Sequence, residues 1–344
     1  TIKNLIAGLM VLLCITFANN IFSLADGTIN YLERSGSHVA FPEVKSWCNK
    51  EVLAFREGNT HAADKGIIRI VLNPLGESKV LSFKDKYYDL RNPYFHHNAK
   101  GLFIYVTVFD YINHEFKGTK EIQIFDSQCD LELKEVSRLE NIIYAPKNSS
   151  LASFSNFSKN IVSIFDEKIF LTSPDMSLQT RVFDEEISFF NGDKLNSIYG
   201  IGRNQKDVGK PLLIYKQKKN KQLEFKSWCG EISDSALVSP KVYIFDNHYY
   251  VSYSSRRLFE GINVDSNENA IGIHWSSFSS ESSLINCRPI HSYSIYFQAD
   301  IDGGYQTYNP ETDRMFFYAR LFKQNKFNIF YINDFLKGLN NFSE

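Results

Sequence analysis

Hydrophobic and polar positions alternate along most of this chain with the two-residue period of β-strands. Short runs of aromatic and β-branched residues are separated by turns rich in Asn, Asp, Gly, Lys and Ser. Beyond the first residues, almost no stretch has the 3.6-residue period of an amphipathic helix. The predicted strands and hairpins cover residues 101–110, 121–127, 160–173, 241–255, 270–278 and 314–334. The pattern therefore predicts an all-β protein.

The predicted strands fall into groups of three or four, and this grouping indicates a repeated architecture. The groups start near residues 51, 93, 158, 197, 239 and 305. Units at a spacing of roughly 40 to 50 residues are typical of propeller blades. We therefore expect a six-bladed β-propeller, in which residues 38–47 add a strand that closes the ring with the last blade. A five-bladed propeller of the glycosidase type is the alternative, and a large β-sandwich is the main competing architecture.

The first residues have the pattern of a secretory signal peptide. Lys3 precedes an apolar run over residues 5–18, and the small residues ending at Ala25 form a cleavage pattern, with a cut after Ala18 as the alternative. The run is shorter than the roughly 20 residues of a membrane span, and no later stretch is apolar enough to cross a bilayer. We expect residues 1–25 to be removed, and the protein to be secreted or periplasmic. No Pro/Gly/Ser linker divides residues 26–344, which are expected to form one domain.

Export changes the interpretation of the cysteines. Once Cys14 is removed, the chain keeps Cys48, Cys129, Cys229 and Cys287. An even number in an oxidising compartment indicates disulfides, with three possible connectivities, although four buried thiols are the alternative. Two of these cysteines end the same tetrapeptide, Lys-Ser-Trp-Cys. The chain has no Cys-x-x-Cys spacing, and His96 and His97 point to opposite faces of a strand, so no metal site is predicted.

Composition and charge exclude two broad classes of protein. With 43% hydrophobic and 15% aromatic residues the chain can build a core, so it is not expected to be disordered. A net charge of -1 provides no basic footprint for nucleic acid. The one basic run, residues 216–221, is expected at the tip of a hairpin.

One predicted hairpin carries more ionisable groups than a turn requires. The segment FREGNTHAADKGIIRI, residues 55–70, places Arg56, Glu57, His61 and Asp64 at the corner between two strands. A hairpin needs only its glycines and one or two turn residues. Surplus chemistry at the end of a strand marks a candidate site.

The same segment resembles the first-blade signature of sialidase-like propeller proteins. Further segments resemble later blades of that family in the same order, and they are residues 89–93 (DLRNP), the GIGR ending at Arg203, residues 239–256 and residues 302–308 (DGGYQTY). Together they span most of residues 50–335. The chain departs from the pattern at Asn92 and Tyr305, where aspartates are expected, and it has no well-formed Asp-box.

The resemblance implies a secreted carbohydrate-active protein, either a sialidase-like exo-glycosidase or a degenerate relative of one. In that family several arginines bind a sugar carboxylate, which suits their planar bidentate donors, and a tyrosine helped by a glutamate attacks the sugar. The resemblance implies ligand-binding roles for Arg56, His61, Arg91, Arg203 and Arg256. It implies catalytic roles for Glu57 as base, Tyr308 as nucleophile and Asp64 as acid. No cofactor is expected, and the partner is a glycan or glycoconjugate.

Each of these residues also has an ordinary structural role open to it. Arginines at strand ends form ion pairs, Asp64 fits a turn before a glycine, and Tyr308 is one of 19 tyrosines. A five-bladed glycosidase of the arabinanase and fructosidase type needs two carboxylates beside the bond, and Asn92 stands in place of an expected aspartate. A non-catalytic propeller that binds a glycan or a protein is therefore the alternative function. Enzymatic activity, the sugar and the oligomeric state are left open by the sequence.

The signal-peptide interpretation gives the first testable prediction. We expect the exported protein to begin near Asp26, because the small residues up to Ala25 suit a signal peptidase. N-terminal sequencing of the exported chain checks this. Recovery of Leu5 in the exported protein would refute it.

Overall fold

The structure is a computed structural model, and two short helices interrupt an otherwise β-strand chain in the residues that it describes. These residues are 27–29, 38–61, 63–139, 177–182, 185–191, 198–202, 212–217, 223–229, 235–258, 269–298, 303–320 and 327–341. The helices are α3 (Glu281–Ile285) and α4 (Phe335–Asn341). No helix within these ranges is long and apolar enough to cross a membrane. The predicted signal peptide, the predicted hairpin over residues 160–173 and Arg203 lie outside the described residues.

In the part of the chain that the structure describes, the strands form five antiparallel sheets, and the first two follow chain order. The first sheet contains β2 (His38–Trp47), β3 (Lys50–Gly58), β4 (Ile67–Leu72) and β5 (Lys79–Phe83). The second sheet contains β6 (Asp89–Asn98), β7 (Gly101–Asp110), β8 (Glu115–Asp126) and β9 (Leu131–Leu139). Both are meanders in which each strand pairs with the next.

The remaining three sheets follow the same rule, with one exception at the end. The third sheet contains β10 (Ser177–Val182), β11 (Glu185–Asn191), β12 (Ile198–Gly202), β13 (Leu212–Gln217) and β14 (Leu223–Trp228). The fourth contains β15 (Ser235–Phe245), β16 (His248–Leu258), β17 (Asn269–Phe278) and β18 (His291–Gln298). The fifth contains β19 (Gly304–Asn309), β20 (Arg314–Ala319), β21 (Asn328–Ile332) and, beyond β21, β1 (Gly27–Ile29).

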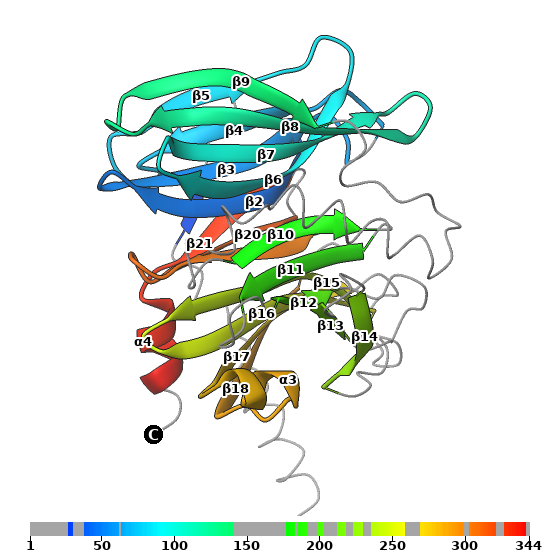
Figure 1. Ribbon diagram of the computed structural model, residues 1–344, viewed down its shortest axis with the longest axis vertical. Helices are drawn as coiled ribbons and strands as arrows, with labels where there is room; N and C mark the ends of the chain where they lie inside the picture. Colours follow the sequence, from blue (N-terminus) through cyan, green and yellow to red (C-terminus); the bar gives the residue numbers. More distant parts are fainter. Residues whose placement is uncertain are drawn as a thin grey trace, which may run out of the picture.

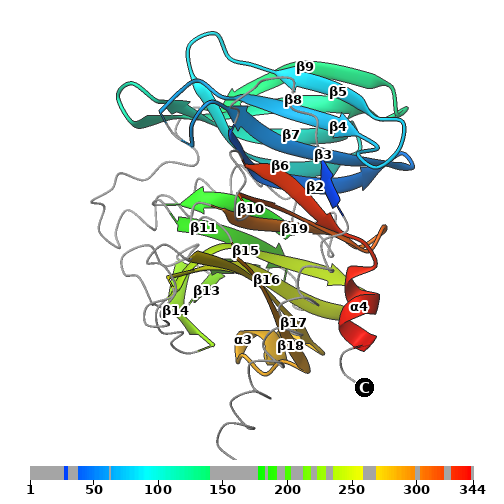
Figure 2. The ribbon, with the colours of Figure 1, turned by 180° about the vertical axis from the view of Figure 1, so that it is seen from behind.

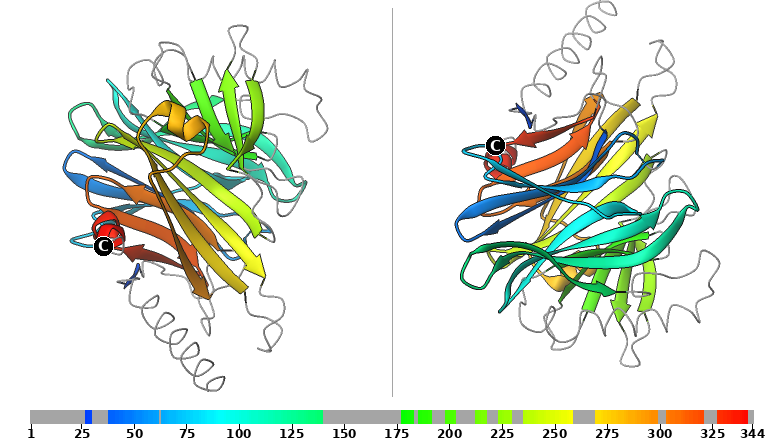
Figure 3. Two further views of the ribbon diagram at one scale, coloured as in Figure 1. Left: turned by 90° about the horizontal axis from the view of Figure 1, so that it is seen from below. Right: turned by 90° about the horizontal axis from the view of Figure 1, so that it is seen from above.

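The five sheets contact one another in chain order, and the last contacts the first. Strand β2 contacts both β6 and β19, β6 contacts β10, β11 contacts β15, and β15 contacts β19. Figures 1 and 2 show the first two sheets together at one end of the molecule, with the fifth sheet beside them. In both views of Figure 3 the blue first sheet lies beside the orange fifth sheet. The prediction of an all-β fold is therefore confirmed, and a two-sheet sandwich is excluded.

The strand that completes the last sheet is not the one expected from the sequence. Residues 38–47 were expected to close the ring, but they form β2 and pair with β3 in the first sheet. The reason is the turn at Cys48 and Asn49, whose φ values of 51° and 58° suit a two-residue hairpin that returns the chain at once. Strand β1 takes the closing place instead, with Thr28 opposite Phe330.

Four strands, each at one edge of its sheet, carry the same backbone irregularity, and we call them the inner strands. In β2, β6, β15 and β19 the register with the next strand shifts by one residue, which is a β-bulge. At each bulge one non-glycine residue has positive φ, and these residues are Phe41 (56°), Asn92 (45°), Ser239 (51°) and Tyr305 (45°). In the first three the following residue is proline. We call these four residues the bulge positions.

The core consists of apolar layers between neighbouring sheets. Phe55 and Phe316 belong to a buried cluster shared by the first and fifth sheets, and Ile70 and Ile104 belong to one shared by the first and second. Trp275 belongs to a cluster between the fourth and fifth sheets that α4 also joins. Burying one such side chain contributes about 1.5–3 kcal/mol, so the aromatic and β-branched runs of the sequence hold the ring together.

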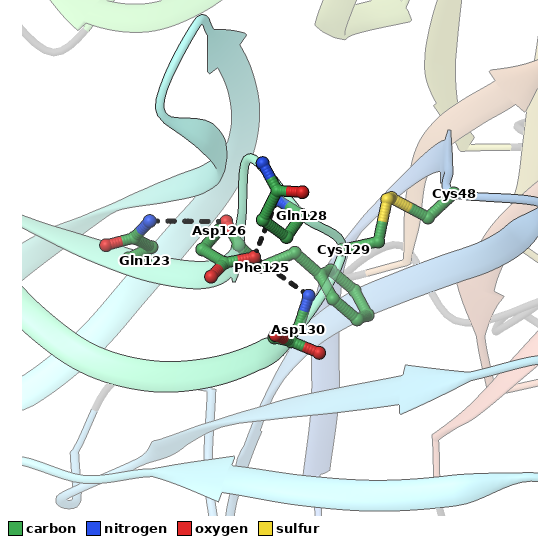
Figure 4. The surroundings of a disulfide bond; sticks show 7 residues. All are labelled: Cys48, Gln123, Phe125, Asp126, Gln128, Cys129 and Asp130. Atoms are coloured by element: carbon green, nitrogen blue, oxygen red, sulfur yellow. Dashed lines mark hydrogen bonds between the residues drawn. A yellow bond between two sulfur atoms is a disulfide. The ribbon is translucent and has the colours of Figure 1, made fainter.

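Two disulfides join neighbouring sheets, which confirms the disulfide prediction and settles the connectivity. Cys48, in the turn after β2, bonds to Cys129, in the turn between β8 and β9, with 5.9 Å between their Cα atoms. Figure 4 shows this bridge from the first sheet to the second. Cys229, after β14, bonds to Cys287, after α3, and so links the third sheet to the fourth. In both copies of Lys-Ser-Trp-Cys, the tetrapeptide ends a strand at a bridge.

We expect each bridge to stabilise the fold measurably. Replacing Cys229 and Cys287 by serine should lower the free energy of unfolding by about 2–5 kcal/mol, because a bridge that closes a long loop restricts the unfolded chain. Urea unfolding followed by tryptophan fluorescence measures the change. A double variant that unfolds at the same urea concentration as the parent would contradict it.

Candidate functional site

Arg56 lies fully buried on β3, and all its guanidinium nitrogens bond within the protein. Its Nε donates to Asp89 Oδ1 at 2.9 Å, and its Nη1 donates to the carbonyl of Thr60 at 2.8 Å. Its Nη2 donates to Asp64, at 3.1 Å to Oδ1 and at 3.3 Å to the carbonyl. The structure therefore brings Arg56 and Asp64 together, as part of a closed set of contacts.

Two glycines of the same hairpin make room for this guanidinium. A Cβ on Gly58 would lie 2.7 Å from Arg56 Nη1, and a Cβ on Gly66 would lie 2.5 Å from Arg56 Nε. The Gly66 amide also donates to Asp89 Oδ1 at 2.8 Å. The glycines of the FREG and DKG segments thus have a packing role around the charge, in addition to any role in the turn.

Asp89 connects Arg56 to Arg91. Its side chain is fully buried, and its Oδ2 accepts a hydrogen bond from Arg91 Nε. The Arg91 guanidinium lies over the ring of Phe109, 3.6 Å from the centroid. Because Arg56 belongs to β3 and Asp89 to β6, this cluster is an ionic link between the first and second sheets.

Asp64 is held as a carboxylate by its surroundings. Burial alone would raise the pKa of Asp64, but hydrogen bonds from Asn59 and Thr60 and the charge of Arg56 hold that pKa below its ordinary value. A general acid needs to carry a proton at the working pH. This environment therefore favours an ion-pair role over the acid role that the resemblance implied, and the acid role stays a prediction.

Glu57 is the carboxylate with one oxygen unused. Its side chain is 2% exposed, and its Oε2 accepts a hydrogen bond from Arg69 Nε. Its Oε1 is buried and accepts no hydrogen bond from any residue that the structure describes. A buried acceptor without a partner is uncommon and calls for an explanation.

His61 lies in an aromatic group at the start of β2. Its ring is 5.1 Å from the ring of His38 and 5.5 Å from that of Phe41. Phe41 is one of the bulge positions, so the first hairpin and the inner strand of its sheet meet at this end of the ring. His61 is thereby brought close to a strained backbone residue, and its ligand-binding role stays a prediction.

Arg256 reaches the same end of the ring from the fourth sheet. Its guanidinium carbon lies 5.5 Å from the ring centroid of Tyr305, and its Nε donates to the carbonyl of Gly303 at 3.1 Å. Tyr305 in turn contacts Phe41 edge to face at 4.9 Å. Strands of the first, fourth and fifth sheets therefore bring Arg256, Tyr305 and Phe41 into one group.

Tyr308 lies in a different part of the fold. Its hydroxyl donates to Asp313 Oδ1 at 2.9 Å, and its ring packs 4.8 Å from that of Trp275 in the layer that α4 covers. Burial, together with the nearby Asp313 carboxylate, raises the pKa of the phenol well above its ordinary value. Among the described residues, no contact joins Tyr308 to Arg56, Glu57 or Asp64, and its nucleophile role stays a prediction.

Sequence reasoning missed the polar group where three inner strands meet. Lys241 of β15 donates to Glu43 of β2, and its Nζ lies 3.5 Å from the carbonyl of Pro42. Thr307 of β19 donates to Glu43 Oε2 at 3.4 Å and accepts from the amide of Val44 at 3.3 Å. The available signal was a proline directly before Glu43 and before Lys241, with no counterpart before Thr307, and it is too short to recognise without the structure.

Metal chemistry finds no support in the described part of the chain. Across the described ranges, no group of three or more His, Cys, Asp or Glu side chains is placed to hold a metal ion. The groups that the structure does bring together at this end of the ring are aromatic rings, arginines and the carboxylates that pair with them.

Comparison with known proteins identifies the fold. No family model matches the sequence, and no curated protein matches it. A solved structure described as a glycoside hydrolase has a TM-score of 0.50 at 11% identity, and the match covers 90% of this chain and 91% of that one. An alpha-L-arabinofuranosidase from Lactobacillus brevis has a TM-score of 0.43 at 13% identity, with 90% and 93% covered. An alpha-L-arabinanase from Cellvibrio cellulosa has a TM-score of 0.46 at 10% identity, with 86% and 91% covered.

The likeness to the glycoside hydrolase establishes the fold alone. The chain has a propeller-type fold of the kind found in glycoside hydrolases. The likeness is to a glycosidase propeller in general, and the sialidase character suggested by the sequence belongs with the proposals below.

The contacts of Arg56 predict a scaffold role that can be measured. Arg56→Ala should lower the free energy of unfolding by about 3–5 kcal/mol, because it leaves the buried Asp89 carboxylate short of a partner. Lys65→Ala, in the same hairpin but exposed, is the control and should change stability by less than about 0.5 kcal/mol. If Arg56→Ala kept the stability of the parent and lost only ligand binding, the arginine would be a ligand-binding residue instead.

Proposed function

We propose that this protein binds a glycan at the end of the ring where the inner strands begin, and that it does not cleave the glycan. The observation that carries the proposal is the chemistry of the bulge positions, which are Phe41, Asn92, Ser239 and Tyr305. Apart from exceptions such as the sialidases with their tyrosine nucleophile, a glycosidase needs a pair of carboxyl groups that flank the scissile bond. None of these four side chains is a carboxylate, whereas phenyl, amide, hydroxyl and phenol groups suit binding to a sugar.

Backbone strain supports a ligand site at these positions. Non-glycine residues with positive φ are uncommon, and for bulky residues such as Phe41 and Tyr305 they are outliers. Each costs about 1–3 kcal/mol, and such residues cluster where ligands bind. Four sheets each have one such residue at the corresponding point of the inner strand. This repetition favours a shared function for the four positions.

The carboxylates at the same end are already neutralised. Asp64 and Asp89 pair with Arg56, and Glu57 pairs with Arg69. Hydrogen bonds from Asn59 and Thr60 and the charge of Arg56 hold the pKa of Asp64 below its ordinary value, so Asp64 is a poor proton donor. Hydrolysis would need two carboxyl groups, one as acid and one as base or nucleophile. Among the described residues of the first hairpin, the carboxyl groups are instead held in ion pairs with arginine.

The finer features of the proposal follow from the sequence and the fold together. We propose that the ligand is a sugar that carries a carboxylate, as in the sialidase-like family, because Arg256 lies beside Tyr305 at this end. We propose five blades rather than six, because the five sheets already contact one another around a complete ring. We also propose export, in line with the signal pattern and the two disulfides.

Hydrolysis is the second candidate function, and Glu57 is the observation that favours it. Its Oε1 is buried and without a partner in the described structure, so it is available to a donor on a ligand. In this alternative Glu57 assists catalysis, and its replacement would remove turnover without removing binding.

Binding and cleavage are separated by two measurements on the same preparation. Isothermal titration against sialylated, uronic-acid and neutral oligosaccharides should detect binding to acidic sugars, and mass spectrometry of the incubated sugars should detect no release. Arg256→Ala should weaken binding roughly ten- to hundredfold, because a hydrogen bond to a charged group is worth about 1.5–3 kcal/mol. Arg288→Ala, an exposed arginine after α3, is the matched control and should bind as the parent does.

Two results would overturn the proposal. Sugar release that Glu57→Gln abolishes would make the protein a hydrolase. If Arg256→Ala bound acidic sugars with the affinity of the parent, the ligand would not bind at this end of the ring.

A further inference from the structure

The residues between β5 and β6 form a short corner whose backbone is fixed to the second sheet. Asp85, 7% exposed, accepts hydrogen bonds on Oδ1 from the amides of Tyr87, at 2.7 Å, and Tyr88, at 3.0 Å. Its Oδ2 pairs with Lys120 of β8 at 2.7 Å. Burial alone would raise the pKa of Asp85, but these hydrogen bonds and the Lys120 charge hold that pKa below its ordinary value. The carboxylate that anchors the corner therefore stays ionised.

A second contact ties the corner to the first hairpin. Lys65 Nζ donates to the carbonyl of Lys86 at 2.8 Å. Next to Lys65, the amide of Gly66 donates to Asp89, the residue that begins β6. The corner therefore has a fixed position beside the ionic link between Arg56 and Asp89.

The side chains of this corner are open to solvent. Tyr87 is 65% exposed, and Lys84 and Lys86 are exposed on either side of the buried Asp85. The Lys86 ammonium lies 5.0 Å from the centroid of the Tyr87 ring. The corner thus presents an aromatic ring and lysines on a supported backbone. Such a surface loses little freedom when a ligand binds, which favours affinity.

The lysines of the corner carry positive charge that no described partner neutralises. Among the residues that the structure describes, no carboxylate forms an ion pair with Lys65, Lys84 or Lys86. By contrast, Lys117 and Lys120 on the neighbouring β8 each pair with two carboxylates. Positive charge without a partner therefore gathers at the corner, and an anionic ligand is attracted there.

The position of the corner indicates which anionic ligand it contacts. Tyr87 precedes the bulge position Asn92 by five residues, a stretch that spans at most roughly 18 Å. The corner and the bulge of β6 therefore lie at the same end of the second sheet. A chain of linked acidic sugars that binds at the bulge positions can extend to the corner, whereas a single sugar unit contacts one place or the other.

We propose that this basic corner, made of Lys65, Lys84, Lys86 and Tyr87, is a second contact region for the same acidic glycan. The ligand is then a chain of several acidic sugars rather than a single one. The inference rests on the proposed function, because the basic corner binds the part of the chain that leaves the bulge positions. The Tyr87 ring stacks on a sugar face, and the lysines attract the carboxylates of the chain as point charges.

The test compares a dimer and an octamer of the same acidic sugar by isothermal titration, with sialic acid in one series and galacturonic acid in another. Tyr87→Ala should weaken octamer binding roughly two- to tenfold, the scale of one aromatic contact, and should leave dimer affinity unchanged. Lys86→Gln should weaken octamer binding roughly two- to fivefold, the scale of one exposed ion pair. Both side chains are exposed, so both variants should fold as the parent does, which circular dichroism checks.

Two further variants are the controls. Lys79→Gln removes an exposed lysine at the opposite end of β5 and should bind both lengths as the parent does. Arg256→Ala acts at the bulge positions and should therefore weaken the dimer and the octamer by the same factor. Added salt should lower the octamer affinity of the parent more steeply than that of Lys86→Gln, because it screens the exposed charge.

The outcomes distinguish this inference from the proposed function. If Tyr87→Ala and Lys86→Gln bound the octamer as the parent does, the basic corner would not contact the glycan, while dimer binding would leave the proposed function in place. If neither length bound to the parent, both would be wrong. Single-stranded DNA of equal charge that bound as tightly as the octamer would also overturn the inference, because the corner would then attract any polyanion.

Discussion

The ring depends on one backbone constraint, the left-handed residue that each of four inner strands accepts. A β-bulge bends its strand and increases the local twist, so the residues after it change direction. Just beyond the bulges, Glu43, Lys241 and Thr307 meet from three different sheets. Without the bulge, the side chains of each strand would shift by one position, and the polar group would no longer converge.

Buried polar links then fix how neighbouring sheets meet. Asn309 of β19 donates to Ser46 and Glu51 of the first sheet, and Gln306 donates to the carbonyl of Ser239 and the hydroxyl of Ser252 in the fourth. Such links are costly if one partner is lost, and in some proteins they specify a unique arrangement more than they add stability. Apolar layers alone tolerate sliding, whereas each of these links fits in one position only.

The charged first hairpin is explained by the same principle. Its surplus groups suggested a ligand site from the sequence, but in the structure Arg56 faces Asp89 of the next sheet and is enclosed by Gly58 and Gly66. Sequence alone could not distinguish these roles, because the decisive partner lies 33 residues away along the chain. A buried ion pair between sheets and an arginine that awaits a ligand require the same residue types.

Local patterns predicted local structure well. The alternation over residues 101–110 matches β7, and the hairpin predicted over residues 241–255 turns between Phe245 and His248, as expected. The sequence did not reveal which distant strands pair, so β2 was assigned to the wrong sheet and β1 was missed. It also gave no sign that Tyr308 is buried against Trp275, because that contact depends on how the fourth and fifth sheets pack.

The pairing of β1 with β21 has a consequence for how the protein is made. Residues 27–29 are synthesised early, but their partners, residues 329–331, follow roughly 300 residues later. At typical rates of synthesis the wait is on the order of 15–60 s, during which the other sheets can already fold. The ring therefore closes last, and until then β1 is without its partner strand and presents an unpaired edge to other chains. A closing strand of three residues keeps that edge short, which limits the chance that a second, half-made copy is captured in its place.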